Sequence, residues 1–511
     1  MATQREPGSN IVAQYTTPFR GTWNSLAVHA IPLDALYDSQ NVFLRRGKLR
    51  NRPGMQAVTD TLFDAPVLGA TLATTPYDKI VLAVTKTSLY ELSETSSEWA
   101  ITRNPENLQY ALSDVSTIDL ALLETSGRYV ALIAERSHPL YQWDGLTRAT
   151  SHIENSDPYG MVPSPSSVCI AARRVIAFTP PHTVQWSATF NHTAWSPLSI
   201  YRLAQTGDEG LCIRALSSLS FVVYKDRSIY VARAQSGTDE LAFNFAEPIR
   251  VEGPAGVHAV VDVSGQHVYM TRSGRVAAFD GTRYPTWLAD GLWLFLQDDI
   301  DPTYAHMIFG VYDYRLHMIQ FVYPKRGDQG KLRGLVLINV PLEGLDVAEG
   351  SGKLYASFKG TLGIACSMGC EMRFNKLINR SMLFSHEDFL IRSFILDEDT
   401  ERDNDVSFPC GIQLPMQALQ DAQHAQVAVE TLVERGKHYG SMLVDGVTSN
   451  FLESPSGTID ITKAHTIDLE RDPVVDIKAF NVPTRFFGLK YRWDSTSNVQ
   501  YAGAVVYARR A

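Results

Sequence analysis

Two cysteines lie close enough together in the sequence to hold a metal ion. Cys366 and Cys370 flank the tripeptide Ser367-Met368-Gly369. Their spacing is longer than that of the common Cys-x-x-Cys zinc knuckle, and no matching second pair exists. We therefore expect two reduced, partly buried thiols here and no metal centre.

An acidic run offers a second set of possible metal ligands. Carboxylates alternate along residues 397–405, at positions 397, 399, 401, 403 and 405. Oxygen-rich loops of this kind bind calcium, but they need a glycine for their sharp turn. The position of that glycine is occupied by Arg402. We expect a solvated acidic loop in preference to a calcium site.

The residue patterns of common enzymes are missing. Gly352-Lys353 is followed by Leu354, where a phosphate-binding loop needs Ser or Thr. Neither a Gly-x-Ser-x-Gly elbow nor a His-Glu-x-x-His pair occurs. Residues 280–287 come nearest to a sialidase-type turn, but their Asp-to-Thr spacing is too long and the motif does not recur. The sequence predicts a protein that is not an enzyme, with no catalytic, cofactor-binding or metal site.

The composition is that of a folded protein without surplus positive charge. Of its 511 residues, 45% are hydrophobic and 20% charged, and the net charge is −9. A general duplex-DNA binder needs a surplus of Lys and Arg, so this class is disfavoured, whereas a conduit through which DNA slides is not. The five cysteines are too few, and odd in number, for a disulfide framework. Neither a signal peptide nor a membrane-spanning segment is expected.

Short β segments that end in an aromatic residue recur along the chain. The anchors Tyr90, Tyr141, Trp186, Tyr230 and Phe279 are separated by 51, 45, 44 and 49 residues. These separations are close to the length of a four-stranded propeller blade. The repeat predicts a mainly β fold, with a β-propeller of six or seven blades over residues 61–370.

The repeat fades after about residue 370. Residues 371–511 contain further strand-like segments, which predict an additional C-terminal β-rich domain of the sandwich type. Residues 1–60 are interpreted as an N-terminal arm and hairpin. Residues 415–428 are the best candidate for a helix, while residues 427–433 are interpreted as a strand.

The N-terminal segment 38–54 has a distinctive order of residues. Asn41 precedes a strand-like stretch, a basic turn at Gly47, a second strand-like stretch and then Arg52-Pro53-Gly54. This order predicts a hairpin that stops at Pro53-Gly54. The segment resembles the opening of tail hub proteins of short-tailed bacteriophages.

Three further segments resemble the same family in the same order, so that the resemblance covers roughly residues 38–290. The first contains Trp186 and Trp195, the second ends at Tyr230, and the third ends at Asp280-Gly281. The C-terminal third resembles the family less clearly. The family-like signature consists of Asn41, Gly47, Arg52, Pro53, Gly54, Trp186, Trp195, Tyr230, Asp280 and Gly281.

The resemblance implies a tail nozzle, or packaged-DNA stabilisation, protein with a β-propeller fold. Such a protein forms a homo-oligomer, typically a hexamer, below the adaptor (head-to-tail connector) ring, and holds tailspikes or tail fibres. A tail needle or plug is a further implied partner. Double-stranded DNA passes through the lumen without sequence-specific contact. The implied location is the tail of the virion, after synthesis in the bacterial host cytoplasm.

Two expectations concern the channel itself. The net charge of −9 suggests a lumen lined by acidic or neutral groups, because like charge repels phosphate and limits friction. The polar, glycine-containing residues 326–331 are a candidate loop for retaining packaged DNA.

Two alternative functions stay open. The first is a phage receptor-binding propeller that recognises or cleaves carbohydrate; paired carboxylates for such chemistry depend on the fold and are not visible in a sequence. The second is a cellular propeller scaffold, although the repeated Trp-Asp and kelch signatures are missing.

Overall fold

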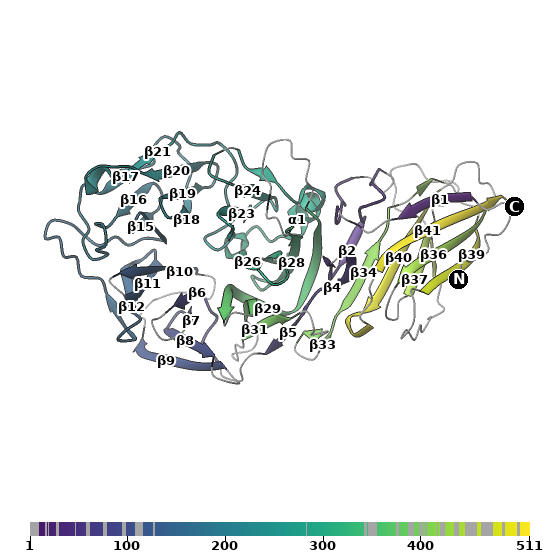
Figure 1. Cartoon of the computed structure of the whole chain (residues 1–511), viewed down its shortest axis with the longest axis horizontal. Helices are drawn as coiled ribbons and strands as arrows, with labels where there is room; N and C mark the ends of the chain where they lie inside the picture. Colours follow the sequence, from purple (N-terminus) through teal and green to yellow (C-terminus); the bar gives the residue numbers. More distant parts are fainter. Residues whose placement is uncertain are drawn as a thin grey trace.

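The computed structural model of the chain contains a β-propeller and a second β domain, joined side by side (Figure 1). The residues that the structure describes are 10–15, 18, 20–26, 30–45, 47–57, 62–74, 79–94, 99–107, 116–125, 128–282, 284–341, 345, 355–374, 378–386, 393–397, 402–403, 406–415, 417–418, 425–433, 439–444, 457–460, 474–482, 486–497 and 501–510.

Five blades of the propeller are four-stranded antiparallel sheets made of consecutive strands. Blade one contains β6 (Gly69–Thr74), β7 (Lys79–Val84), β8 (Ser88–Glu94) and β9 (Trp99–Asn107), and blade two contains β10 (Asp119–Thr125), β11 (Arg128–Glu135), β12 (His138–Asp144) and β13 (Ala149–His152). Blade three contains β14 (Ser167–Ala171), β15 (Arg174–Thr179), β16 (Thr183–Trp186) and β17 (Ile200–Arg202), and blade four contains β18 (Gly210–Ser217), β19 (Ser220–Lys225), β20 (Ile229–Ala234) and β21 (Phe243–Phe245). Blade five contains β22 (Val260–Val263), β23 (Gln266–Met270), β24 (Val276–Phe279) and β25 (Thr286–Trp287).

Blades six and seven share one long strand, β29 (Ser357–Phe374). Blade six has the strand order β26 (Phe309–Asp313), β27 (Met318–Pro324), β28 (Leu332–Asn339) and β29, from the inner to the outer edge. The first residues of β29 form this outer strand by pairing with β28. Its later residues pair with β30 (Ile378–Ser385) as the inner strand of blade seven. The sheets therefore form seven blades, and the predicted β-propeller is confirmed.

The N-terminal part of the chain completes the last blade. Next to β30 lies β31 (Ser393–Asp397), which pairs with β5 (Gly54–Ala57) as the outermost strand of blade seven. Because β29 also contacts β6 of blade one, the ring closes on itself. A short hairpin of β32 (Arg402–Asp403) and β33 (Val406–Ser407) extends the same sheet beyond β5. The closing strand thus covers a sheet edge that would otherwise stay unpaired.

Hydrophobic side chains fill the space between successive blades. Separate buried clusters join blades one and two, two and three, three and four, four and five, and five and six. The largest cluster joins blades six, seven and one, and it continues into the second β domain through Phe43, Ile412 and Trp493. The apolar residues of each blade therefore pack mainly against neighbours that are near in the sequence, except at the closure.

The second β domain consists of two sheets that we call the sandwich domain. The first sheet contains β3 (Val42–Arg45), β4 (Lys48–Asn51), β41 (Tyr501–Arg510), β36 (Ala425–Val433), β39 (Val474–Val482) and β1 (Asn10–Tyr15). The second sheet contains β2 (Asp38–Gln40), β34 (Pro409–Gln413), β40 (Phe486–Asp494), β37 (Tyr439–Val444), β38 (Gly457–Asp460) and β35 (Gln417–Ala418). The predicted additional β domain is present, and it uses strands from both ends of the chain (Figure 1).

Domain boundaries in the structure differ from those expected at residues 60 and 370. Strands β1 to β4 of the supposed N-terminal arm belong to the sandwich domain, whereas β5 belongs to the propeller. Position 370 falls inside β29, and β30 and β31 beyond it still belong to blade seven. The aromatic repeat could not reveal this, because the last blade is assembled from two distant parts of the chain.

Local predictions agree with the structure in more detail. The expected hairpin forms between β3 and β4, with Gly47 at a φ of +75° in the turn, while Arg46 lies outside the described residues. Residues 427–433 lie within strand β36, as expected, whereas the helix expected at residues 415–428 is wrong, because residues 417–418 form β35 and residues 425–428 belong to β36. Helices are short in the described part of the chain: α1 (Trp293–Asp299), η1 (Asp239–Leu241), η2 (Asp290–Leu292), η3 (Ala305–Met307) and η4 (Ser495–Ser497). Within that part, no helix is long and apolar enough to cross a membrane.

A recurrent carboxylate stabilises several blades. In blades one, four and five, an acidic residue ahead of the inner strand accepts hydrogen bonds from the turn between the second and third strands. The pairs are Asp64 with the hydroxyls of Thr85, Thr87 and Ser88, Asp208 with Ser228 and the Arg227 N–H, and Glu252 with the N–H and hydroxyl of Ser273. Each pair ties the start of a blade to its central hairpin.

In blade four the carboxylate also faces a buried cation. The side chain of Lys225 is fully buried, and its Nζ lies 3.4 Å from Oδ1 of Asp208 and 2.8 Å from the Thr206 carbonyl. Burial lowers the pKa of Lys225, and the nearby Asp208 opposes this effect. Burial also raises the pKa of Asp208, but hydrogen bonds from Thr206, Arg227 and Ser228 outweigh it and bring this pKa to about 2.

We predict that Asp208→Ala lowers the free energy of unfolding by about 3–5 kcal/mol, because it leaves the buried Lys225 without its counter-ion. Adding Lys225→Met to this variant should restore part of the loss. The control is Asp226→Ala, whose exposed pair with Arg227 should contribute no more than about 1 kcal/mol. Urea unfolding of the four proteins measures these differences, and equal stability of the two single variants would contradict the prediction.

A histidine links blades four and five. Nδ1 of His267 lies 2.8 Å from the Tyr224 hydroxyl, and its Nε2 lies 2.8 Å from the Ala215 carbonyl oxygen. A neutral ring satisfies both contacts, with Nε2 donating and Nδ1 accepting. Burial lowers the pKa of His267 to about 4, although the Ala215 carbonyl acts in the opposite direction.

This histidine should make stability depend on pH. The pKa of His267 lies near 4 in the folded protein and near 6.5 in the unfolded chain, so its contribution is complete above pH ~6.5 and is lost as the pH falls toward 4. We predict that His267→Gln is less stable at pH 7.5 but loses less stability between pH 6.5 and 4. Unfolding midpoints across this pH range test the idea, and parallel curves for both proteins would refute it.

Candidate functional site

The predicted signature residues of the N-terminal segment meet at the joint between the propeller and the sandwich domain. Arg52 and Pro53 lie between β4 of the sandwich domain and β5 of the propeller, and Gly54 begins β5. Asn41 lies between β2 and β3. Asn41 is 11 residues from Arg52 in the sequence, and the structure brings Asn41, Arg52 and Pro53 into one buried network.

The guanidinium of Arg52 uses all five of its N–H groups. Nε donates to Oδ1 of Asn41 at 3.0 Å, and Nη1 donates to the Pro53 carbonyl at 2.8 Å and to Oδ1 of Asp403 at 2.9 Å. Nη2 donates to the Thr361 carbonyl at 3.2 Å and to Oδ2 of Asp403. The side chain is fully buried, so every donor must find an acceptor within the protein.

The carboxylate of Asp403 is saturated in the same way. Besides the two bonds from Arg52, Oδ1 accepts the N–H of Met55 at 3.2 Å, and Oδ2 accepts the N–H of Gly363 at 2.8 Å. The ring of Phe408 covers the guanidinium, with its centroid 3.8 Å from Cζ of Arg52. The ion pair therefore joins β5, β29 and β32 and lies under an aromatic lid.

Asn41 connects this ion pair to the sandwich domain. Its Oδ1 accepts the N–H of Thr361 at 2.8 Å as well as Nε of Arg52, and its Nδ2 donates to the Pro409 carbonyl at 2.8 Å. The residue has a φ of +55°, a conformation that Asn tolerates better than most other side chains. This explains physically why an Asn suits the position before β3.

Further polar contacts cross the joint. Nζ of Lys359 on β29 lies 2.6 Å from Oδ1 of Asp38 on β2. The Asn339 amide on β28 donates to the Leu44 carbonyl at 2.6 Å and accepts the Leu44 N–H at 3.3 Å. With the shared hydrophobic cluster, these contacts hold the two domains in one defined arrangement.

The acidic run predicted as a solvated loop contributes its most important carboxylate to this joint. Asp403 is buried and its two oxygens are fully engaged, so it is unavailable as a calcium ligand. Residues 398–401 and 404–405 of the run lie outside the described residues. The described part of the chain contains no group of three or more His, Cys, Asp or Glu side chains that could hold a metal ion.

The cysteines lack the environment of reactive thiols. All five are buried, including Cys366 and Cys370 on β29. Burial raises the pKa of Cys212 to about 12, although Arg214 opposes the shift. It also raises the pKa of Cys410 at the joint to about 12, against the effect of Arg52. Since the thiolate is the nucleophile, such groups are inert near neutral pH.

The remaining signature residues stay apart and serve individual blades. Nε1 of Trp186 donates to the Asp239 carbonyl at 2.6 Å, and Nε1 of Trp195 donates to the His192 carbonyl at 2.9 Å. The Tyr230 hydroxyl lies 2.9 Å from Oγ1 of Thr206. In the turn after β24, Asp280 accepts the N–H and hydroxyl of Thr282, both at 2.8 Å, and Gly281 has a φ of +81°. These contacts stabilise blades three to five and do not form a common site.

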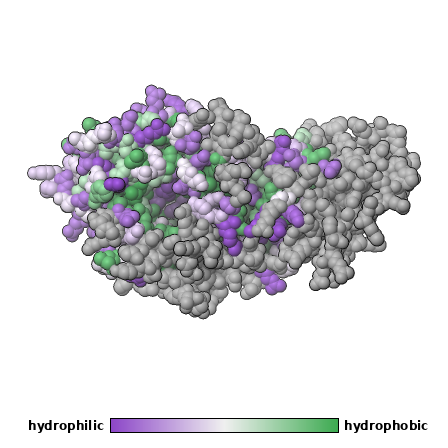
Figure 2. Space-filling model, viewed as in Figure 1, coloured by the Kyte–Doolittle hydropathy of each residue, from purple (hydrophilic) through white to green (hydrophobic). Residues whose placement is uncertain are grey.

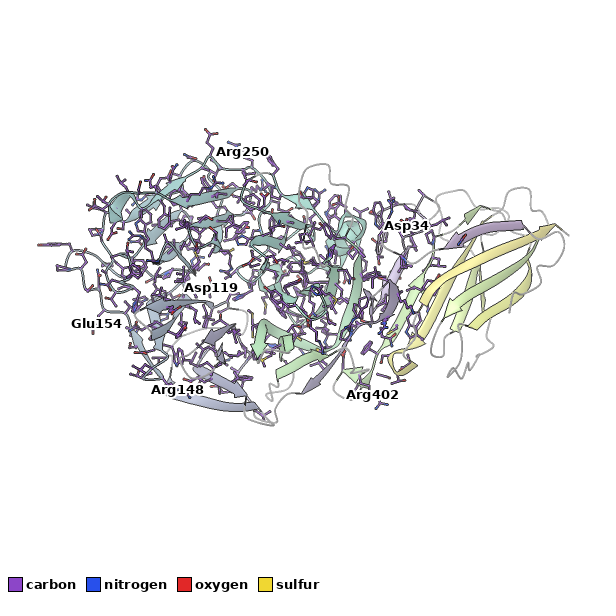
Figure 3. All side chains as sticks on the ribbon, in the orientation of Figure 1. Asp34, Asp119, Arg148, Glu154, Arg250 and Arg402 are labelled. Carbon is purple, nitrogen blue, oxygen red and sulfur yellow. The ribbon has the colours of Figure 1, made fainter. Side chains whose placement is uncertain are left out.

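A charged cluster occupies the middle of the propeller, where Asp119 lies, while Arg148, Glu154 and Arg250 lie toward its periphery (Figure 3). Oδ2 of Asp119 on the inner strand β10 accepts Nη1 of Arg214 at 2.7 Å and the Ser167 hydroxyl at 2.5 Å. Arg214 on β18 also donates to the Val257 carbonyl ahead of β22. The inner sides of four successive blades are thus connected.

His258 reaches the opposite side of the same central region. Burial lowers the pKa of His258 to about 4, while Asp119 and, to a smaller extent, the nearby carbonyls of Ile118 and Leu68 act in the other direction. These carbonyls belong to the segments that lead into blades two and one, whereas His258 precedes β22 of blade five. Side chains therefore bridge the propeller across its axis.

Residues 326–331 form a compact turn. The N–H of Asp328 donates to the Lys325 carbonyl, and the N–H of Lys331 donates to the Asp328 carbonyl, both at 3.1 Å. Arg326 donates to the carbonyls of Ile300 and Gln297, at 3.2 and 3.3 Å, near the end of α1. The role of this turn in retaining DNA stays a prediction.

Comparison with known proteins adds only a distant likeness. No protein-family model matches the chain, and no curated protein matches it either. Among solved structures, the chain is similar to Chaetomium thermophilum Raptor, with 8% identity and a TM-score of 0.41. The similarity covers 68% of this chain and 29% of the Raptor chain, so this chain corresponds to less than a third of that protein's length.

We predict that Arg52→Ala and Asp403→Ala each destabilise the protein by about 3–5 kcal/mol, because each leaves a buried charge without its partner. The double variant Arg52→Met with Asp403→Leu should recover part of the loss. Arg20→Ala is the control, since its pair with Asp34 is more than one third exposed and contributes about 0–1 kcal/mol. Chemical unfolding gives the stabilities, and Arg52→Ala behaving like Arg20→Ala would overturn the assignment.

Proposed function

We propose that this chain is a structural subunit of a bacteriophage tail nozzle, placed below the adaptor ring of the virion. In this role it forms part of the channel that retains packaged DNA and guides its ejection. The observation that carries the proposal is the joint: Asn41, Arg52 and Pro53, which resemble the tail-hub signature, meet in a saturated buried network. A network of this kind supplies fixed geometry, which is what a wall of a conduit needs.

The contacts between inner strands bear on where DNA would pass. Asp119, Arg214 and His258 lie on the inner sides of blades two, four and five and interact with one another. We therefore place the duplex between subunits arranged in a ring and not through a single propeller. Ring assembly needs a heterologous interface, in which one face of each subunit meets a different face of the next.

We assign the contact face of such a ring to a group of exposed apolar residues. Tyr159, Met161, Phe190, Leu198 and Leu241 are each more than half exposed. They lie on the loops before β14 and before β17 and on η1, and hydrogen bonds join these segments, such as those from the Ser156 N–H to the Thr193 carbonyl and from Thr189 to Asp239. On the described propeller face seen in Figure 2, hydrophilic and hydrophobic residues are interspersed. Exposed groups of apolar side chains favour protein contacts.

The proposed assembly is a homo-oligomer, with six subunits as the expected number. Its partners would be the adaptor ring above, a tail needle or plug in the channel, and tailspikes or tail fibres on the flanks. The net charge of −9 supports a lumen of acidic or neutral groups, which repels phosphate and leaves DNA free to move. No bond-making or bond-breaking chemistry is part of this proposal.

We predict that the purified chain forms closed rings in negative-stain electron micrographs, with six subunits per ring. Leu198→Asp should reduce the fraction of rings at least roughly tenfold, because it places a charge in the proposed contact face. Val406→Asp, at an exposed position on the β32–β33 hairpin, is the matched control and should assemble normally.

Antibodies against the chain give a second measurement on intact virions. Labelling at the tail supports the proposal, whereas a monomeric protein that labels no virion contradicts it. Labelling at the tips of fibres, together with binding or cleavage of a cell-surface glycan, would instead support the receptor-binding alternative.

A further inference from the structure

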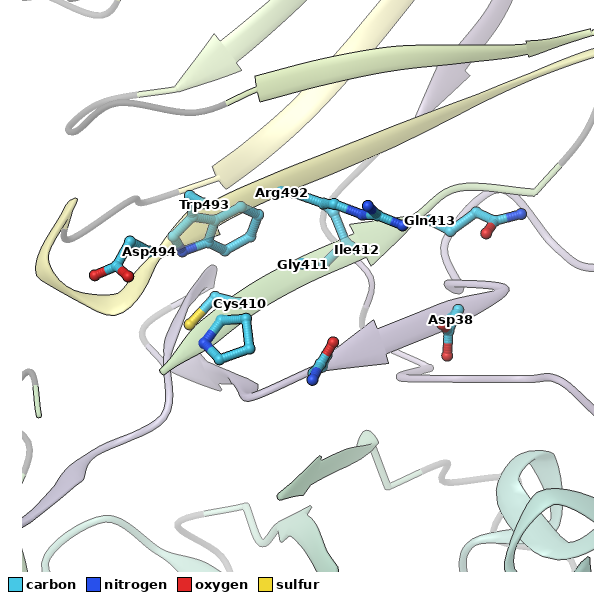
Figure 4. A pocket seen from close by; sticks show the side chains of 10 residues that line it. Asp38, Cys410, Gly411, Ile412, Gln413, Arg492, Trp493 and Asp494 are labelled. Atoms are coloured by element: carbon cyan, nitrogen blue, oxygen red, sulfur yellow. The ribbon is translucent and has the colours of Figure 1, made fainter. Parts of the chain in front are cut away.

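A hollow of about 350 Å³ lies against the second sheet of the sandwich domain, and its lining combines the exposed Gln40, Arg492 and Asp494 with the buried Cys410, Ile412 and Trp493 (Figure 4). Its lining residues come from three neighbouring strands, β2, β34 and β40. The volume lies near the lower end of the range for ligand pockets, about 300–1,000 Å³, which suits a single small ring. This hollow borders the buried joint, since Asp38, Pro409 and Cys410 belong to both.

Sheet register explains the shape of the hollow. Gly411 on β34 pairs with Gln40 on one side and with Arg492 on the other, so the central position of the face has no side chain. Two pairs further along, and therefore on the same face, Asp38 lies opposite Gln413. Figure 4 shows Arg492 extending along the sheet toward Gln413. A ligand above Gly411 would therefore be flanked by a guanidinium and an amide, both placed by paired strands.

The carboxylates at the rim already have partners. Asp38 is paired with Nζ of Lys359 at 2.6 Å. Oδ1 of Asp494 accepts the N–H and hydroxyl of Thr496, at 3.1 and 2.8 Å. Burial raises the pKa of Asp494, but these bonds, Ser407 and Arg402 outweigh it, so that the pKa is lowered and the group stays ionised.

The open hydrogen-bonding capacity of the hollow consists mainly of donors. Within the described part of the chain, the Arg492 guanidinium and the amides of Gln40 and Gln413 make no hydrogen bond to another side chain, and Arg492 and Gln40 are exposed to solvent. The charged side chains that line the hollow are Asp38, Asp494 and Arg492. Lys359 balances Asp38 and Arg402 acts on Asp494, so within the described residues Arg492 is the lining charge without a counter-ion. An anion with acceptor oxygens suits this guanidinium.

We propose that the hollow binds a carboxylate carried on a hydroxyl-rich ring the size of one hexuronic acid. The carboxylate accepts two parallel hydrogen bonds from Arg492, the geometry that a guanidinium offers to a planar anion. The amides of Gln40 and Gln413 both donate and accept, which matches ring hydroxyls. The floor is rigid because Pro409 is tied to Asn41 of the joint. This inference does not depend on the proposed nozzle function.

The test is a titration of the full chain with three probes in low-salt buffer, followed by isothermal calorimetry and ligand-observed NMR. The probes are glucuronate, glucose and acetate, which separate the contributions of ring and carboxylate. We expect glucuronate to bind with a Kd of ~1 mM or tighter, and glucose and acetate at least ~10-fold more weakly. Raising the salt concentration should weaken glucuronate binding, because the rim is exposed and screened.

Two variants and a control locate the binding. Arg492→Ala should weaken glucuronate binding at least ~10-fold, and Gly411→Leu should do the same by filling the hollow while leaving Arg492 in place. Arg250→Ala removes an exposed arginine elsewhere on the propeller and should bind like the parent protein (Figure 3). Thermal unfolding of each variant verifies that it is folded.

Several outcomes would overturn the proposal. Unchanged binding by folded Arg492→Ala or Gly411→Leu would place the ligand elsewhere. If glucose bound as tightly as glucuronate, the carboxylate would contribute nothing to binding. If acetate bound as tightly as glucuronate, the ring would contribute nothing. The absence of saturable glucuronate binding up to ~10 mM would refute the site itself.

Discussion

The architecture depends on one buried ion pair between residues 351 positions apart, Arg52 and Asp403. Taking two such charges out of water costs several kcal/mol per ion, and the cost is offset only when the geometry is good and the remaining hydrogen-bonding groups are satisfied. Both conditions are met here, since five N–H groups of Arg52 and four acceptor sites of Asp403 are in use. A pair of this kind specifies one arrangement, because any displacement leaves several groups unsatisfied at once.

Because of its position, the same ion pair stabilises both the closure of the propeller and the attachment of the sandwich domain. Arg52 follows β4 of the sandwich domain and immediately precedes β5, which completes blade seven. Asp403 lies on β32, which pairs with β5 and leads into β34 of the sandwich domain. The same short segments therefore seal the ring and set the angle between the domains. A rigid subunit with two fixed lobes results, as the proposed place in a tail assembly requires.

Much of the propeller could be predicted from the sequence, because each of the first five blades is local. Anchors such as Tyr141, Trp186 and Tyr230 recur at blade spacing, and Gly47 marks its hairpin through a positive φ. Closure could not be predicted, since β5 pairs with strands more than 300 residues away and carries no repeat of its own. The burial of Asp403 could not be predicted either, because it lies in an acidic run whose composition predicts a solvent-exposed loop. The hollow at Gly411 depends on cross-strand register, which a sequence does not reveal.

The origin of the closing strand has a consequence for biosynthesis. Residues 54–57 leave the ribosome early, but their partner β31 begins only at residue 393. At translation rates of about 5–20 residues per second, the interval is on the order of 20–70 s. During that time five complete blades can form while the nascent propeller still has an open seam. Exposed strand edges can pair with the edges of other chains. Crowded polysomes or a lack of chaperones should therefore increase aggregation of the nascent protein before its last quarter is made.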